Sequence, residues 1–277
     1  MNKLHELIQK HGILVAAHRG MSCGNVPCNT IAAFEIAMRA GARILEMDIF
    51  QSLDGVLYVF HTGKEPVQLG IDCDVTKMTS EEIDKIPLVN CDGVPTSHRI
   101  NKFADVLEYL RGKDVLLNLD RAGDILPEVL SFVRERGMME QILLKTKAKI
   151  EYLKMVEKYA PDVMFMPIYD HVDEMSSVID SMNINFVGAE LVFKDEDQQV
   201  IQPEYISAMK EKGMILWGNG ILYSDLVPLS AGHTDDESLY GNPDHGWGWL
   251  AEHGFQIIQT DWAPQCFQYL ESKGWSQ

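Results

Sequence analysis

Two carboxylates, Glu46 and Asp48, interrupt an otherwise apolar run at residues 44–50. Side chains alternate along a strand, so both share one face, either a barrel interior or a helix-covered side. Adjacent carboxylates without a counter-charge cost several kcal/mol when they lose water. A divalent cation would offset this repulsion, and Asp120, which ends the third candidate strand, is well placed as a third ligand. An all-carboxylate site favours a hard ion, Mg²⁺ or Ca²⁺, over zinc.

Two imidazoles accompany the carboxylates: His18 ends the first candidate strand and His61 follows a short turn. Such groups titrate near neutral pH and can exchange protons there. The coincidence of four such groups favours a functional site. Glu190 and Asp261, each taken alone, are expected to be helix caps or solvated loop residues. The other histidines are expected to be surface or structural residues; they stand at positions 5, 11, 98, 171, 233, 245 and 253.

Short β-rich runs alternate with helical patterns along the chain, which favours a parallel sheet closed into a (β/α)₈ TIM barrel. The candidate strands cover residues 13–18, 43–50, 115–120, 141–146, 163–168, 185–191, 214–219 and 255–260. A helix is expected to begin at an Asn29 cap and to end before Gly41. An open doubly wound sheet is the alternative, but no glycine-rich phosphate loop follows the first strand.

Two long excursions interrupt this alternation, both after strand ends. We expect one domain over residues 1–277, with an inserted subdomain at about 51–112 that begins with a β-hairpin. The second excursion, residues 220–250, contains Trp247 and Trp249. These tryptophans either pack on a glycerol or sugar group or belong to the core of a short helix. Insertions on the carboxyl face of a barrel are typical of substrate-binding loops.

Composition narrows the partners. The net charge of −17 disfavours nucleic acid and stable association with an anionic membrane. Five scattered cysteines fit no zinc cluster and indicate reduced thiols in a cytoplasmic protein. We expect no signal peptide and no membrane span, since no apolar run approaches the roughly 20 residues that a span requires. The expected partner is a small molecule, and the sequence leaves the oligomeric state open.

Several of these residues lie in motifs that resemble the glycerophosphodiester phosphodiesterases. The dense part of the resemblance covers residues 15–61: AHRG, an Asn-Thr helix start in PCNT, an E-x-D strand, a DG turn and a histidine. Further along, LLNLD, LWGN and GFQIIQTDWAP are similar, in order, to later elements of that family. Each motif alone is weak, whereas the ordered set is specific.

The resemblance implies a (β/α)₈ barrel that hydrolyses glycerophosphodiesters to glycerol 3-phosphate and an alcohol. It implies that the three carboxylates named above hold one divalent cation, that His18 and His61 are the general acid and base, and that Arg19 binds a phosphate oxygen. A metal and a guanidinium suit the extra negative charge of attack at phosphorus. The attacking group is either a glycerol hydroxyl, which gives a cyclic phosphate, or water.

The chain departs from the family pattern at three positions, with Cys28 in place of a Glu, Thr62 in place of an Asp and Ala122 in place of a Lys. Lys145 or Arg121 would supply the missing positive charge. We prefer Lys145, which ends the adjacent strand, as a ligand of the substrate phosphate. These changes bear on the substrate more than on the chemistry.

Two alternatives remain open at this point. One is a related phosphodiesterase acting on a lysolipid or a sugar phosphodiester, as in the sphingomyelinase D-like phospholipases. The other is a non-catalytic barrel that only binds its ligand.

Overall fold

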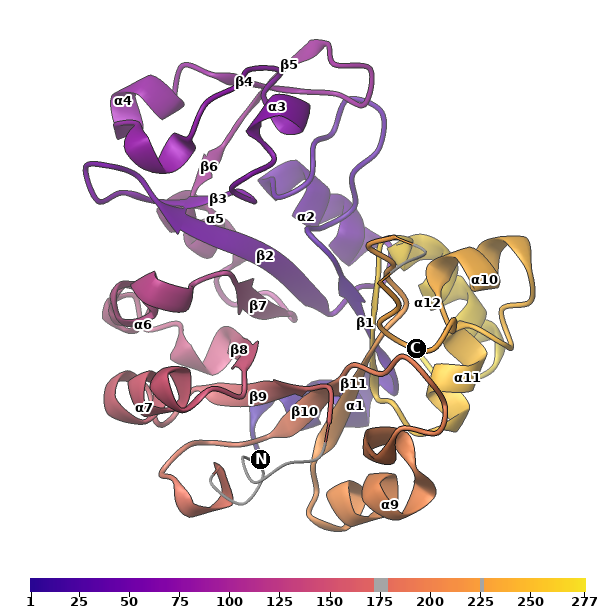
Figure 1. The fold of residues 1–277 in the computed structure, drawn as a ribbon. Coiled ribbons are helices and arrows are strands. Elements are labelled where there is room, and N and C mark those ends of the chain that lie inside the picture. The colour runs from indigo at the N-terminus through magenta and orange to yellow at the C-terminus, as the bar shows by residue number, and fades with distance from the viewer. Residues whose placement is uncertain (172–178, 225–226) are drawn as a thin grey trace.

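The computed structural model describes residues 1–171, 179–224 and 227–277 (Figure 1). Within these ranges eight parallel strands form a closed barrel, because β1 pairs with both β2 and β12. This confirms the predicted TIM barrel, and the open-sheet alternative is wrong. In barrel order the strands are β1 (Leu14–Ala17), β2 (Ile44–Gln51), β7 (Leu116–Asp120), β8 (Ile142–Lys147), β9 (Met164–Tyr169), β10 (Gly188–Leu191), β11 (Ile215–Asn219) and β12 (Ile257–Thr260).

Helices surround the barrel, and α1 (Lys3–His11) closes its amino end, where Leu4 and Leu7 pack on the barrel interior. The other helices that follow barrel strands are α2 (Ile31–Arg39), α5 (Phe103–Leu110), α6 (Leu126–Glu135), α7 (Ile150–Tyr159), α9 (Pro203–Glu211), α10 (Asp235–Tyr240), α11 (Trp247–Glu252) and α12 (Ala263–Ser272). Short 3₁₀ turns are η2 (Gly123–Ile125), η3 (Met139–Gln141) and η4 (Gln199–Ile201). The predicted Asn29 cap is wrong, since Thr30 accepts the hydrogen bond from the N–H of Ala33.

Strand alternation decides which side chains enter the barrel. On β2, Leu45 and Met47 belong to the core between sheet and helices, whereas Ile44 belongs to the interior cluster. Glu46 and Asp48 share the parity of Ile44 and therefore face the interior. Equivalent interior positions near the amino end are apolar, whereas those near the carboxyl end are polar. The sequence pattern thus places a polar layer above an apolar floor.

The first excursion lies between β2 and β7 and has an apolar cluster of its own around Phe50, Tyr58 and Phe60. The β2–β3 hairpin is confirmed, with Gln51 opposite Leu57. Its elements are β3 (Leu57–Val59), α3 (Glu65–Gln68), η1 (Val75–Lys77), α4 (Ser80–Ile83), β4 (Pro87–Val89), β5 (Pro95–Arg99) and β6 (Asn101–Lys102). That residues 51–112 form a subdomain inserted in one domain stays a prediction.

The second excursion carries α10 and α11 against the carboxyl-terminal helix. Trp247 is buried in the main core, so the core interpretation is confirmed for it. The ring of Trp249 stacks between those of His233 and His253, with centroid distances of 3.8 and 3.6 Å. Across the described ranges no helix has the length and apolarity needed to cross a membrane.

Candidate metal centre and active site

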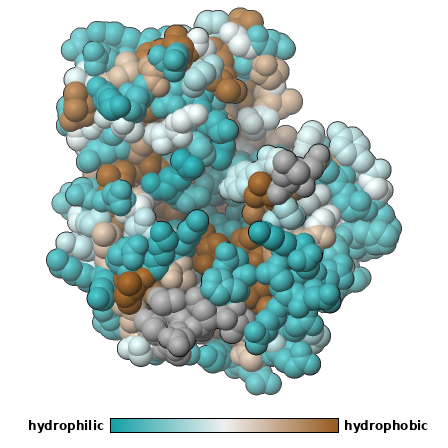
Figure 2. Space-filling view, viewed as in Figure 1, coloured by the Kyte–Doolittle hydropathy of each residue, from teal (hydrophilic) through white to brown (hydrophobic). Residues whose placement is uncertain are grey.

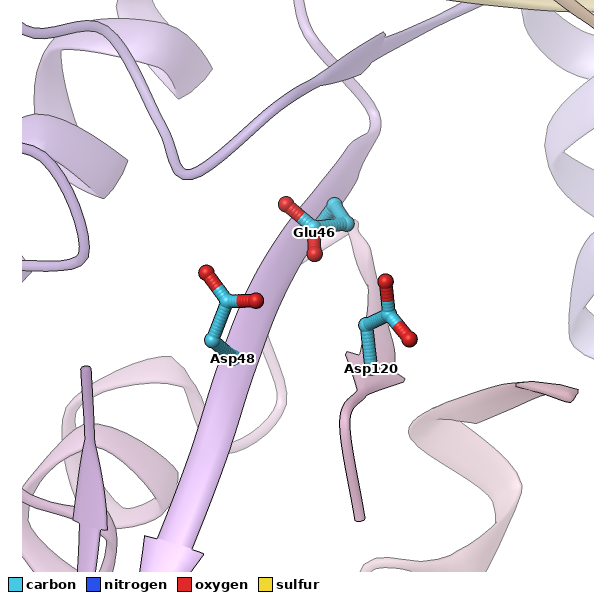
Figure 3. A group of neighbouring side chains, drawn as sticks. All are labelled: Glu46, Asp48 and Asp120. Carbon is cyan, nitrogen blue, oxygen red and sulfur yellow. The ribbon is translucent and has the colours of Figure 1, made fainter. Parts of the chain in front are cut away.

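Glu46, Asp48 and Asp120 meet at the carboxyl end of the barrel. Asp48 lies opposite Asp120 in the parallel β2–β7 register, and the three residues offer oxygen atoms within 4.8 Å of one another (Figure 3). Glu46 and Asp48 are buried, at 2% and 1% exposure. The donor set is three carboxylate oxygens, which fits a hard divalent cation. This cluster can therefore hold a metal ion.

Neighbouring donors hold the carboxylates in place. The backbone N–H of Arg19 donates to Glu46 Oε2 at 2.9 Å, and Asn29 Nδ2 donates to Asp48 Oδ2 at 2.8 Å. Arg19 Nε lies 3.0 Å from Asp48 Oδ2 but is not aligned for a hydrogen bond, so the contact is an ion pair. Arg121 Nε lies 3.7 Å from Asp48 Oδ1. Two guanidinium groups thus approach this one carboxylate.

The backbone around the cluster adopts a conformation that non-glycine residues rarely use. Arg19, Asn29 and Arg121 have φ angles of 56°, 56° and 57°, in the left-handed region. At Arg121 this turn follows the end of β7 and lets the N–H donate to Asp120 Oδ1 at 2.7 Å. Strain of this kind persists where the surroundings enforce it, commonly at functional sites.

Burial and the nearby charge of Asp48 disfavour the ionised form of Glu46. Desolvation and the adjacent charge of Asp48 raise the pKa of Glu46 to about 8, although His18 and Arg19 act in the opposite direction. Without a further positive charge, the carboxylate therefore holds a proton near neutral pH. A divalent cation in the cluster would replace that proton.

The two imidazoles are each tied through Nδ1. His18 Nδ1 lies 2.8 Å from Asp261 Oδ1, and His61 Nδ1 lies 2.9 Å from the carbonyl oxygen of Thr62. A carboxylate and a carbonyl only accept, so both Nδ1 atoms carry a hydrogen. This leaves Nε2 of each ring for proton transfer.

The surroundings shift the pKa values of the two imidazoles in opposite directions. Burial lowers the pKa of His18, but the hydrogen bond to Asp261 and the charge of Glu46 outweigh it, so the pKa is raised overall. Burial lowers the pKa of His61, helped by the charges of Arg19 and Arg121, against the pull of Asp48. Of the two imidazoles, His18 therefore holds its proton more strongly, and His61 is the one that is more easily neutral.

Asp235, an acidic residue of the second excursion, is connected to His18 through Asp261. It is buried and accepts hydrogen bonds from Trp247 Nε1 and Thr260 Oγ1, both at 2.7 Å, and from the Asp261 N–H at 2.9 Å. Burial raises the pKa of Asp235 to about 6. Asp261 is exposed, as expected, yet it joins Asp235 to His18. No motif or spacing in the sequence indicated this connection.

Lys145 lies in the barrel interior, away from solvent. Its Nζ is 2.8 Å from Glu190 Oε2, donates to Gln259 Oε1 at 3.0 Å and lies 3.6 Å from the centroid of the Trp217 ring. The expectation that Glu190 is a cap or a solvated residue is wrong, since only 7% of it is exposed. Arg121, the other cation considered, approaches the carboxylate of Asp48. That Lys145 binds the phosphate stays a prediction.

None of the three residues that depart from the family pattern adds a charge to the carboxylate cluster. Burial raises the pKa of the Cys28 thiol to about 11, so at neutral pH it does not replace a carboxylate. Ala122 is buried, and the Thr62 carbonyl accepts the hydrogen bond from His61 Nδ1.

The space-filling view shows hydrophilic residues around a hollow between the inserted segment and the carboxyl-terminal elements (Figure 2).

Fold and site together define a (β/α)₈ barrel with an acidic cluster at its mouth. By sequence, the chain is 31% identical over 163 residues to a glycerophosphodiester phosphodiesterase of Caldanaerobacter subterraneus subsp. tengcongensis, which covers 56% of this chain and 66% of that protein. A family model described only as a domain of unknown function matches residues 165–270. The chain is thus related to the glycerophosphodiester phosphodiesterases, as its motifs predicted.

Solved structures agree on the fold. A glycerophosphoryl diester phosphodiesterase of Parabacteroides distasonis superposes with a TM-score of 0.79 at 18% identity, covering 99% of this chain and 93% of that one. An Oleispira antarctica phosphodiesterase in complex with the product sn-glycerol-3-phosphate gives 0.67 at 16% identity, covering 98% and 100%. At such identities the likeness concerns the fold alone.

Proposed function

We propose that this chain hydrolyses glycerophosphodiesters to glycerol 3-phosphate and an alcohol. The observation that carries the proposal is the convergence of Glu46, Asp48 and Asp120 within 4.8 Å, beside two imidazoles of opposite pKa shift. The named relative of 31% identity and the neighbour that holds sn-glycerol-3-phosphate support a small phosphodiester as substrate.

The three carboxylates would hold one Mg²⁺ or Ca²⁺. When bound, such an ion polarises a phosphoryl oxygen and offsets the negative charge of the transition state. Arg19 and Arg121, whose guanidinium groups approach Asp48, are nearby groups that can bind phosphate oxygens. Lys145 stays a candidate for the phosphate, at the interior side of the site.

The histidines divide the proton transfers. His61, kept neutral and tied at Nδ1 by the Thr62 carbonyl, accepts the proton of the attacking hydroxyl at Nε2. His18, kept protonated by Asp261, donates a proton from Nε2 to the leaving alkoxide. The step therefore ends with His61 protonated and His18 neutral, and exchange with solvent restores both. If a glycerol hydroxyl attacks, water then opens the cyclic phosphate to give glycerol 3-phosphate.

The test is release of glycerol 3-phosphate from glycerophosphocholine and glycerophosphoethanolamine with Mg²⁺, with Ca²⁺ and with EDTA. We expect activity with at least one ion and none with EDTA. Glu46→Gln should lower kcat/KM by at least ~10³-fold, since it removes a ligand of the ion.

A matched control is Glu65→Gln, which alters another buried glutamate, in the inserted segment. This variant should keep the wild-type rate. Activity that survives both EDTA and Glu46→Gln would reject the metal centre. Stabilisation by Mg²⁺ without cleavage of any diester would favour the non-catalytic binding protein instead.

A further inference from the structure

Two adjacent barrel strands bring four polar side chains together, two from each strand. In the parallel β2–β7 register, Glu46 lies opposite Asn118 and Asp48 lies opposite Asp120. Residues two apart on a strand face the same side, so all four side chains enter the barrel interior. Three of them are the carboxylates that can hold an ion (Figure 3). Asn118 is the fourth member, beside Glu46 and one step nearer the apolar floor than Asp120.

The amide of Asn118 is held at one end. Its Nδ2 donates to the backbone carbonyl oxygen of Leu143, on β8, at 3.0 Å. A carbonyl only accepts, so the NH₂ group is the end that faces Leu143. Nδ2 and Oδ1 lie on opposite sides of the amide carbon, and β7 lies between β2 and β8 in the barrel. The bond to Leu143 therefore turns Oδ1 away from β8, to the side on which Glu46 lies.

Oδ1 of Asn118 is a buried acceptor without a partner. The residue is 0% exposed, and this atom makes no hydrogen bond with the described residues. Its neighbours on the same face are Leu116 and Asp120 along β7, Glu46 on β2 and Leu143 on β8. When the carboxylates are ionised, none of these four side chains can donate a hydrogen bond. Leaving a buried oxygen unsatisfied is costly, so this atom calls for another partner.

A divalent cation would satisfy the amide oxygen and the carboxylates together. Hard ions bind amide carbonyl oxygens as well as carboxylates. The amide adds an oxygen without adding charge, so it does not increase the repulsion within the cluster. A trapped water is the alternative partner, because it could donate to Oδ1 and to a carboxylate at once. In that case ion binding would not depend on Asn118.

We propose that Asn118 supplies, through Oδ1, a fourth side-chain oxygen of the ion site. The inference rests on the proposed function for the presence of the ion, and it adds a residue to those that hold it. β7 then contributes Asn118 and Asp120 to the site, as β2 contributes Glu46 and Asp48.

The test is ion binding, measured by calorimetric titration of metal-free protein with Mg²⁺ and with Ca²⁺. Asn118→Leu, which is similar in volume, removes the oxygen. For the ion that the wild type binds more tightly, its Kd should rise by at least ~10-fold. The increase in melting temperature on adding that ion should shrink accordingly.

Asn118→Asp separates the oxygen from the rest of the amide. The aspartate keeps an oxygen at this position but loses the hydrogen bond to Leu143, so it should be less stable than the wild type in EDTA. It should nevertheless bind the ion at least as tightly as the wild type, since a carboxylate replaces the amide oxygen. A purely structural role for the Leu143 bond would weaken ion binding in both variants alike.

Asn219→Leu is the matched control. Asn219 is also buried, its Nδ2 donates to Glu190 Oε1 at 2.8 Å, and its Oδ1 has no partner among the described residues. It stands on β11, four strands from β7 around the barrel. Both leucine variants give up one side-chain hydrogen bond and should lose stability in EDTA, but Asn219→Leu should keep the wild-type Kd for the ion.

Three results would overturn the inference: an unchanged Kd in Asn118→Leu, an equal rise in Asn219→Leu, or an Asn118→Asp variant that binds as weakly as Asn118→Leu. If Asn118→Leu fails to fold, Asn118→Asp decides the question. An ion-induced increase in its melting temperature at least as large as that of the wild type supports the inference, and a smaller one overturns it.

The proposed function fails separately. A wild type that binds the ion with the help of Asn118 but cleaves no diester would reject the function and keep the inference. A wild type that binds neither ion would overturn the metal site on which both rest.

Discussion

The two sides of the barrel mouth use buried charge in opposite ways. On β2 and β7, three carboxylates crowd together, and in the described part of the chain two guanidinium groups form ion pairs with one of them, Asp48. On β8 and β10, Lys145 and Glu190 neutralise each other 2.8 Å apart. The first arrangement is stable only with an added proton or cation, while the second is complete by itself. The difference separates a cluster that can hold an ion from an ion pair whose charges are already balanced.

The acidic side should make metal-free protein less stable as pH rises. The pKa of Glu46 is about 8 in the folded protein and near 4.5 when unfolded, so the folded state holds a proton that the unfolded state has lost between these values. Stability therefore falls from pH 4.5 to 8 by several kcal/mol. Thermal unfolding in EDTA across this range measures the effect.

Glu46→Gln should lack this part of the decline, and saturating Mg²⁺ or Ca²⁺ should reduce it in the wild type. Glu65→Gln should decline as the wild type does. An identical slope in Glu46→Gln would mean that the carboxylate is already ionised, and the contrast between the two sides would disappear.

The balanced side should depend on keeping both of its charges. Lys145→Met leaves Glu190 buried without its cation and should cost about 3–5 kcal/mol in the free energy of unfolding. The double variant Lys145→Met/Glu190→Gln removes both charges and should recover most of that loss. Urea unfolding of the three proteins gives the values.

Arg134→Met is the control for this pair, since Arg134 and Asp162 form a surface ion pair in which both side chains are about half exposed. Its cost should stay within about 1 kcal/mol. If the double variant is as unstable as the single one, Lys145 stabilises the barrel through its contacts with Trp217 and Gln259 rather than through charge balance.

The histidines should produce a bell-shaped pH dependence of kcat/KM. The lowered pKa of His61 places the acid limb below the ordinary imidazole value of 6.5, and the raised pKa of His18 places the basic limb above it. Activity rises as His61 loses its proton and falls as His18 loses its own.

His61→Gln should remove the acid limb and His18→Gln the basic limb, each with a loss of at least ~10²-fold. His5→Gln, at the amino end of the barrel, should leave the profile unchanged. If the pH profile of either active-site variant keeps both limbs, other groups transfer the protons.

Much of this arrangement was predictable from alternation along the strands. All eight predicted strands exist, with ends within three residues of the observed ones, because long apolar runs fix them. The same parity rule could have located Glu190 and Gln259. Gln259, for example, stands two residues after the interior residue Ile257. What alternation cannot give is loop geometry, so Asn29 was expected to cap a helix instead of binding Asp48.

The smallest expected effect comes from Asp235, a buried carboxylate that is balanced by neutral donors instead of by charge. Its Oδ2 accepts the Asp261 N–H, and Asp261 in turn holds His18. In Asp235→Asn the side-chain oxygen can still accept the hydrogen bonds from Trp247 and Thr260. The NH₂ group then faces the Asp261 N–H, and because both groups are donors, the Asp261 backbone is displaced. The hydrogen bond between Asp261 and His18, which raises the pKa of His18, would be weakened.

We therefore expect Asp235→Asn to move the basic limb of the pH profile downward and to lower kcat by less than ~10-fold, whereas KM changes little. Asp236→Asn, at the exposed neighbouring position, should match the wild type. A merely structural role for Asp235 would lower stability without moving the limb. An unmoved limb together with a normal melting temperature would show that Asp261 orients His18 unaided, so that the acidic side of the mouth needs no support from the second excursion.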